Sequence, residues 1–163
     1  MDLLIKNEKL SFKGEVKWIK TRGGVLVAES PWMQNRVLSG PGRGVSLMLD
    51  RLANITTNSG VITHAELGID NLPVNPSQPG VINGLVRSAV GLVTRSGLEV
   101  TFRFFFLDAL TPNNTYFEFG MYTAGTMTIG SGAGFNRLTM LTNPLVKVTG
   151  EDITLICRVT GSV

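Results

Sequence analysis

The sequence predicts an all-β protein, an antiparallel sandwich or barrel with one short helix, and three observations support this fold class. Residues 99–107 and 152–160 alternate apolar and polar side chains, the pattern of a strand with one buried face. Other short apolar segments recur between clusters of glycine, asparagine, proline and serine, which mark turns. A single segment, residues 41–55, instead spaces its apolar side chains as a helix does. Many short strands joined by such turns are typical of antiparallel sandwiches and barrels.

The alternating segments define which side chains should face the core. Phe105 interrupts the alternation, so we expect both faces of that strand to be covered there. Further strands are expected at residues 15–20, 25–29, 61–69, 84–93, 115–122, 136–142 and 145–149. The side chains expected on the buried faces of the two alternating segments are Val100, Phe102, Phe104, Phe106, Ile153, Leu155, Cys157 and Val159.

The helix is expected to cover one end or edge of the β-structure. Its apolar face should carry Val45, Met48, Leu49 and Leu52, which fall at helical spacing. A loop at residues 70–80 follows the next strand and holds three of the seven prolines. A loop of this length without a core of its own is typical of crossing or contact segments, so its prolines Pro73 and Pro76 are interface candidates.

Length and charge limit the classes of function. A chain of 163 residues fits one domain, which we place at residues 13–163. Charged residues make up 17% of the chain, below the roughly 25% typical of soluble domains, so we expect a surface covered by partners and a homo-oligomer. The net charge is +3 without a basic run, and no apolar stretch is long enough for a signal peptide or membrane span. Neither nucleic acid nor a membrane is therefore an expected partner, and synthesis in a cytoplasm is expected.

Residues 1–12 form a possible N-terminal arm. The segment is apolar enough to bind a neighbour through Leu3, Leu4 and Ile5, and no turn signal ties it to the following strand. Such an arm can add a strand to a neighbouring subunit or to a shell beneath it. The alternative is an ordinary edge strand of the same domain.

Two glycine-rich stretches raise the question of phosphate binding. Residues 130–134 read GSGAG, but neither they nor residues 39–44 match a dinucleotide or Walker fingerprint. We interpret Gly130, Gly132 and Gly134 as turn or bulge positions that need positive φ. Residues 40–44 precede the helix, so anion binding with the help of Arg43 stays open there. No cofactor is expected.

The glycines of the following stretch predict a hairpin instead. Gly120 and Gly125 should bracket it, with Tyr122 and Thr126 near its turn.

The residues needed for catalysis or metal binding are scarce. The chain has one histidine, His64, and one cysteine, Cys157, so neither a zinc site nor a cysteine–histidine nucleophile is expected. Glu66 and Glu118 each lie mid-strand near a glycine, and an acid pair across two strands could serve a glycosidase. We favour the structural interpretation, in which these acids point outward or bind backbone at a bulge. No catalytic residue is assigned.

An aromatic side chain in a loop is the second interface candidate. Trp32 and Met33 follow a proline, outside the strongest strands. Tryptophan is enriched at the buried centres of interfaces, which makes the pair an anchor candidate. In the alternative, Trp32 only closes one end of the sandwich.

Residues 118–122 read E-x-G-M-Y and are followed by a Gly-Thr turn at residues 125–126, an aromatic-x-Arg segment at residues 135–137 and a closing strand. In this order of motifs the C-terminal half resembles small structural proteins of tailed bacteriophages. Residues 34–54 and 62–70 agree loosely with the same proteins, although residues 73–79 replace a shorter, acidic loop. The matching residues are Glu118, Gly120, Met121, Tyr122, Gly125, Thr126, Phe135, Arg137, Lys147, Gly150 and Glu151.

The resemblance implies a jelly-roll-like β-sandwich that acts as an oligomer in the virion, after assembly in the host cytoplasm. The implied function is that of a capsid decoration (cement) protein, with the major capsid protein or another virion structural protein as partner. A tail or baseplate component is the alternative from the same resemblance. A carbohydrate-binding module is the rival from another class, although aromatic residues are only 7% of the chain.

Overall fold

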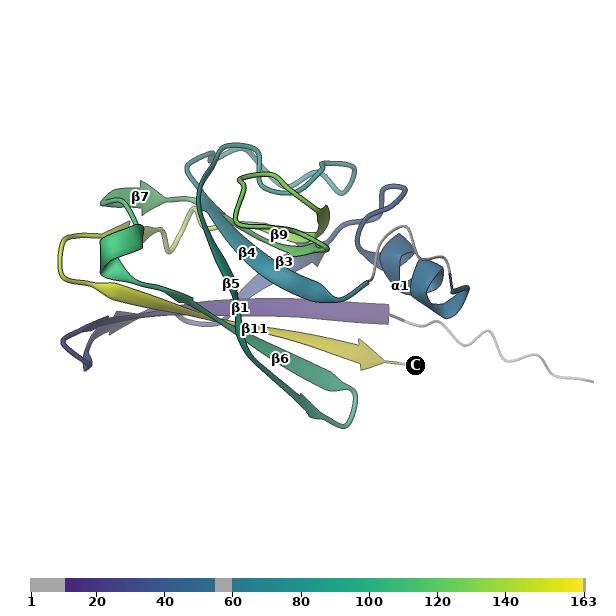
Figure 1. Ribbon diagram of the computed structural model, residues 1–163, viewed down its shortest axis with the longest axis horizontal. Helices are drawn as coiled ribbons and strands as arrows, with labels where there is room; N and C mark the ends of the chain where they lie inside the picture. Colours follow the sequence, from purple (N-terminus) through teal and green to yellow (C-terminus); the bar gives the residue numbers. More distant parts are fainter. Residues whose placement is uncertain (1–10, 55–59, 163) are drawn as a thin grey trace, which may run out of the picture.

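The computed structural model describes residues 11–54 and 60–162, and in these residues the chain is mostly β with one short α-helix (Figure 1). The helix is α1 (Val45–Leu52), and a 3₁₀ turn, η1 (Asp108–Leu110), follows β6. The strands are β1 (Ser11–Arg22), β2 (Val25–Glu29), β3 (Met33–Val37), β4 (Ile62–Gly68), β5 (Gly84–Ser96), β6 (Glu99–Phe106), β7 (Asn114–Tyr116), β8 (Glu118–Thr123), β9 (Ala133–Thr139), β10 (Leu145–Lys147) and β11 (Asp152–Ser162).

The main sheet closes on itself into a barrel. Its strand order is β11-β6-β5-β4-β8-β9-β3-β1, and β11 pairs with β1 along its whole length, from Ser11 opposite Ser162 to Thr21 opposite Asp152. β2 extends the sheet beyond β1, and β7 pairs with β10 in a separate two-stranded sheet. Within the described residues the barrel therefore has eight strands, all joined antiparallel.

The closure corrects the jelly-roll-like sandwich that the resemblance implies. Two strands turn the corners between the two halves of the wall. β5 pairs with β4 along Gly84–Ala89 and with β6 along Val90–Ser96, and β3 pairs first with β1 and then with β9. Because each corner strand serves both halves, the sheet continues around the core where a two-layer sandwich would end at an edge.

The core fills the interior of this barrel and matches the alternation in the sequence. Cys157 is fully buried, and the other inward side chains of β6 and β11 that the pattern marks are buried too, apart from the partly buried Val100 and Phe102. Phe105 is the exception, because it is 46% exposed on the outer face, over Gly91. The expectation that both faces are covered at Phe105 is wrong.

The helix is where residues 41–55 predict it, but its buried side is different. Leu47 is fully buried, whereas Leu49 and Leu52 are 59% and 81% exposed. Leu47 packs at the open end of the barrel, beside the partly buried Met48. A helix of eight residues has little room for an amphipathic pattern, so spacing alone did not identify the face.

The predicted hairpin is confirmed, with Tyr122 and Thr126 near its turn, but Gly120 and Gly125 do not bracket it. β8 and β9 pair antiparallel, Gly120 lies in β8 and Gly125 in the connection of residues 124–132. β3 is a strand that the sequence did not predict. The expected arm extends to residue 12, but Ser11 and Phe12 begin β1, and residues 1–10, with Leu3, Leu4 and Ile5, lie outside the described residues.

Candidate functional site

Glu66 lies on β4 and faces the outside of the barrel, where it meets Arg87 of β5. Arg87 Nε is 3.1 Å from Glu66 Oε2 as an ion pair, and the two side chains are 0% and 1% exposed. The Gly130 N–H donates to the same carboxylate oxygen at 2.8 Å. Burial raises the pKa of Glu66, and the Gly130 N–H and Arg87 partly oppose this.

The Glu66–Arg87 pair holds the connection between β8 and β9 in place. Arg87 donates to the carbonyl oxygens of Thr126 and Thr128 at 2.9 and 2.6 Å, and to Ser131. A charge buried this deeply is tolerated only when it is paired and hydrogen-bonded, and here the loop supplies the bonds. The pair thus fastens residues 124–132 over the sheet.

Glu118 of β8 pairs with Arg137 of β9 in the same way. Arg137 Nε and Nη2 lie 3.0 and 2.9 Å from Glu118 Oε2, and both side chains are 0% exposed. The Glu118 carboxylate accepts backbone N–H groups of Asp70, Ile82 and Asn83 at 3.2, 2.9 and 2.8 Å. This second pair fastens the proline-rich loop to the barrel.

The proline-rich loop therefore packs over the outer face of the barrel. Arg137 donates to Gln78 Oε1 at 2.8 Å and reaches the Pro73 carbonyl at 3.5 Å. The Ser39 N–H donates to the Pro76 carbonyl at 3.1 Å. Pro73 is exposed and Pro76 half-buried, so the structure leaves Pro73 on the surface as an interface residue would be.

Tyr122 lies between the two ion pairs and completes this region. Its hydroxyl accepts the Val81 N–H at 2.8 Å, and the Arg87 guanidinium lies 4.4 Å from its ring centroid. We call the outer side of β4, β8, β9 and Gly84–Ala89, with residues 70–83 and 124–132 over it, the covered wall. In this wall Glu66 and Glu118 neutralise arginines and bind backbone, and neither faces solvent.

The glycine-rich stretches meet at the edge of the covered wall, around a hollow of about 320 Å³ that Gly42, Arg43, Tyr122, Gly130 and Gly132 line. Gly130 and Gly132 have φ of 73° and 82°, as the sequence predicts for turns, but Gly134 does not. A Cβ on Gly134 would lie 2.1 Å from the Pro79 carbonyl oxygen, so close approach of two chain segments explains that glycine.

The start of α1 does not offer the free N–H groups of an anion site. Val45, Ser46 and Leu47 donate to the carbonyls of Leu38, Arg43 and Gly44 at 3.1, 3.0 and 3.2 Å. Arg43 donates from Nη1 to the Ser77 carbonyl at 2.7 Å. The anion site that stayed open in the sequence is not supported by this geometry.

His64 lies on the outer face of the barrel, on β4, whereas Cys157 lies on the inner face, on β11. His64 faces outward on β4, with Nδ1 3.0 Å from Thr63 Oγ1, and Cys157 faces the core, where burial raises its pKa well above the ordinary value. No group of three or more His, Cys, Asp or Glu residues that could hold a metal ion occurs within residues 11–54 and 60–162. In the same part of the chain, no helix has the length and apolarity needed to cross a membrane.

A groove of about 790 Å³ opens where β1 and β3 separate, at the end of the barrel where β1 begins. Its lining includes Phe12, Asn35, Val37 and Val74. Asn35 is 5% exposed, and within the described residues neither of its side-chain polar atoms has a hydrogen-bond partner.

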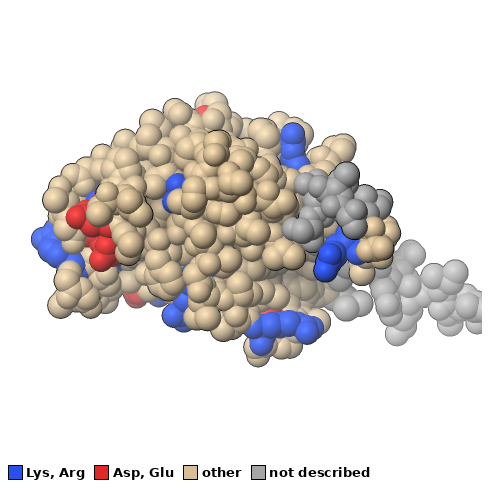
Figure 2. Space-filling view, viewed as in Figure 1, with Lys and Arg blue, Asp and Glu red and all other residues tan. Residues whose placement is uncertain are grey.

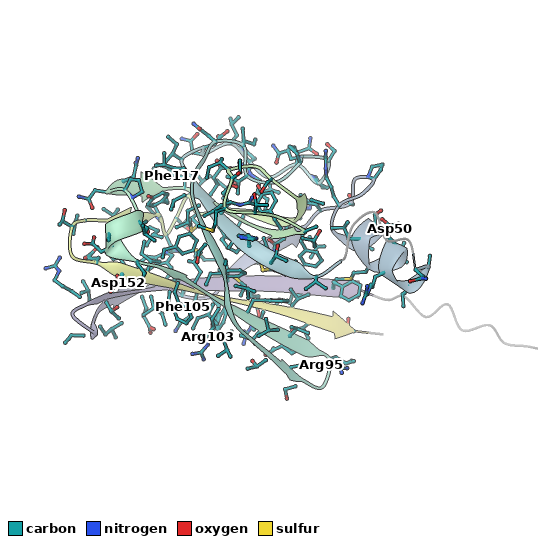
Figure 3. All side chains as sticks on the ribbon, in the orientation of Figure 1. Asp50, Arg95, Arg103, Phe105, Phe117 and Asp152 are labelled. Carbon is teal, nitrogen blue, oxygen red and sulfur yellow. The ribbon has the colours of Figure 1, made fainter. Side chains whose placement is uncertain are left out.

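A second group of strands forms a wall of a different kind, with outer side chains that are partly or fully exposed. We call β2, β1, β11, β6 and Val90–Ser96 the open wall. Figure 3 shows Arg103 and Phe105 on the outer side of β6 and Arg95 near the tip of the β5–β6 hairpin. Trp32 is 38% exposed and lies against this wall, with its ring centroid 4.1 Å from the Arg158 guanidinium and 6.0 Å from Lys17 Nζ.

Trp32 and Met33, the anchor candidates of the sequence, are therefore separated. Trp32 lies outside the barrel and does not close its end, whereas Met33 begins β3 and packs against the core. Most exposed apolar residues of the open wall lie elsewhere, on β2 and on the second half of β5, with Phe105 on β6. The sequence predicts strands at both places but no function for them. The available signal is a run of consecutive apolar residues in a short strand, because such a strand must expose apolar side chains on at least one face.

Figure 2 shows how few charged side chains occupy the face seen in this orientation, with blue and red atoms mainly near its margins. This agrees with the low charge fraction of the chain. No family model, no curated protein and no solved structure matches the chain.

Proposed function

We propose that this chain is a non-enzymatic structural protein of a tailed-bacteriophage virion, a capsid decoration (cement) protein that binds the shell through oligomeric contacts. The observation that carries the proposal is the contrast between the two walls. The buried charges of the covered wall are used to fasten loops, while the open wall presents apolar strands to solvent. A protein that works by adhesion needs such a surface and no preorganised acid–base pair.

The resemblance of residues 118–151 to virion proteins gives this adhesive surface a biological setting. The major capsid protein or another virion structural protein is the proposed partner. Glu118, Tyr122 and Arg137 belong to that resemblance and also build the covered wall. These residues therefore stabilise the fold. The open wall and the loop around Pro73 are the surfaces proposed to contact the partner.

Co-sedimentation tests the proposal. Particles made from the encoding genome with this gene deleted are mixed with the purified chain, pelleted and assayed for bound chain and for resistance to heat. We expect saturable binding to particles and a higher temperature of genome release. Absence of binding to any particle fraction would overturn the proposal.

The same experiment separates head from tail. Binding to tail-less heads supports decoration, and binding to isolated tails alone would replace it by a tail or baseplate role. Particles pretreated to remove surface glycans serve as the control for carbohydrate recognition, because a glycan-binding module would lose binding to them.

A further inference from the structure

The open wall is a five-stranded antiparallel sheet in the order β2-β1-β11-β6-β5, and each of its two outermost strands has an edge without a ladder partner in the described part of the chain. β2 pairs with β1 on one side and lies at the end of the strand order. β5 pairs with β4 only along Gly84–Ala89, so Val90–Ser96 is bonded to β6 alone. Unpaired backbone N–H and C=O groups along such edges are ready to pair with another strand.

Both edges expose apolar side chains, although each ladder has a register shift, between Lys20 and Thr21 opposite β2 and between Val90 and Leu92 of β5. On β2, Val25, Leu26 and Val27 are 70%, 59% and 46% exposed. On β5, Leu92 and Val93 are 46% and 49% exposed. Lysine, proline and inward-pointing charges normally block an exposed edge, yet Val25–Glu29 contains no lysine or proline and Gly91–Ser96 has Arg95 as its one charge.

The direction of the strands makes the two edges compatible with one another. Five strands that alternate in direction leave the two outermost strands running the same way. A second copy placed beside the first by rotation or translation along the sheet therefore sets β2 of one copy parallel to β5 of the next. The charges are also compatible, because β2 carries Glu29, which pairs with Lys17 at 2.8 Å and stays 49% exposed, while the β5 edge carries Arg95 and no acid.

We propose that copies of this chain associate head to tail, with β2 of one copy paired to Val90–Ser96 of β5 in the next. Leu26 and Leu92 face outward on their strands, as their partners Thr21 and Arg103 do, so they can meet on one face of the joined sheet. The association closes into a ring or continues as an open filament, depending on the rotation between copies.

This inference names the surfaces behind the oligomeric contacts of the proposed function. It rests on that function only in taking the chain to associate with copies of itself. Its test uses the purified chain alone, so it can fail while particle binding succeeds, or succeed while particle binding fails.

The test uses one variant blocked at each edge. Leu26→Lys/Val27→Lys places two charges on β2, and Leu92→Lys/Val93→Lys does the same on β5. The control is Leu110→Lys, an exposed leucine of η1 outside both edges. All five substituted residues are exposed, so the variants should keep the circular dichroism spectrum and melting temperature of the parent.

The masses in solution decide the outcome. We expect the parent and Leu110→Lys to form oligomers, and each edge variant alone to be a monomer. A 1:1 mixture of the two edge variants should give a dimer and nothing larger, because each variant keeps one working edge.

Three results would overturn the inference. The first is a parent that stays monomeric at the highest concentration reached. The second is an edge variant that still dimerises alone, which would show that like edges pair. The third is a mixture that stays monomeric although the parent associates.

Discussion

The covered wall and the open wall belong to one barrel, but they treat their outer faces in opposite ways. The covered wall has charged side chains at its centre, and two loops seal them from solvent. The open wall has its charged pairs at the surface, as in Glu15 with Lys13 and Arg158, and leaves apolar strands exposed. The difference indicates that the covered wall is complete within one chain, whereas the open wall is a surface on which a partner can fit.

The largest expected effect comes from removing a charge in the covered wall. Arg137→Met leaves the Glu118 carboxylate buried without its partner, and we expect the free energy of unfolding to fall by about 3–5 kcal/mol. Urea denaturation gives this value. Arg103→Met on the exposed side of β6 is the control and should change stability by less than about 0.5 kcal/mol. Similar losses for both variants would contradict the contrast between the walls.

A smaller loss is expected where a loop approaches the covered wall most closely. In Gly134→Ala the new Cβ would lie 2.1 Å from the Pro79 carbonyl oxygen, so the loop must move. We expect a destabilisation of about 1–3 kcal/mol, as for other overpacked sites, measured by thermal unfolding. Gly40→Ala is the matched control, since its nearest atom lies at 3.7 Å. Equal melting temperatures for the two variants would show that the loop is not fastened as described.

On the open wall, removal of a side-chain contact should change the free energy of unfolding only a little. Trp32→Ala removes the ring that lies over Arg158, and an exposed cation–π contact contributes about 0.5–1 kcal/mol. A double-mutant cycle with Arg158→Ala measures the coupling directly. A loss above about 2 kcal/mol would mean that Trp32 is part of the fold and is not free to serve as an anchor.

The pH dependence should differ in sign between the walls. The Lys13 side chain, with Arg158, lowers the pKa of Glu15 on the open wall, although desolvation opposes the shift, while burial raises the pKa of Glu66 on the covered wall. The stability contributed by Glu15 is therefore present above its ordinary pKa of 4.5 and is lost as the pH falls through its lowered pKa. For Glu66, the folded state loses stability as the pH rises from 4.5 through its raised pKa.

Carboxyl-selective NMR titration measures both groups in one sample. Glu15→Gln and Glu66→Gln assign the two signals. Two midpoints on the same side of 4.5 would contradict the expected difference in environment.

The parts of the fold that follow from local pattern were accessible from the sequence. The alternation in residues 99–107 and 152–160 is that of two long strands with one face in the core, and the structure has β6 and β11 there. β3 was missed because its sequence, MQNRV, carries three polar residues in a row, and its strand geometry comes from pairing with β1 and β9. Barrel closure likewise depends on long-range pairing of β1 with β11, which no local pattern encodes.

The candidate site could be predicted only in part from the sequence, because it too depends on long-range strand pairing. The structural role favoured for Glu66 and Glu118 agrees with their contacts, since each binds backbone N–H groups. Their arginine partners lie 21 and 19 positions away in the chain, on strands whose register the sequence does not give. The open edges depend on strand order, so only the folded chain reveals them.

Hydrogen–deuterium exchange of the chain alone and bound to particles tests the central claim most directly, that partners occupy the open wall. Amides of β2 and of Val90–Ser96 that point away from β1 and β6 have no partner strand within the described chain, so they should exchange quickly at concentrations where the free protein is monomeric. We expect strong protection of residues 25–29 and 91–96 on assembly, with little change in residues 124–132, whose loop is already fastened. Protection confined to the covered wall, with unchanged exchange in both edge strands, would contradict the account.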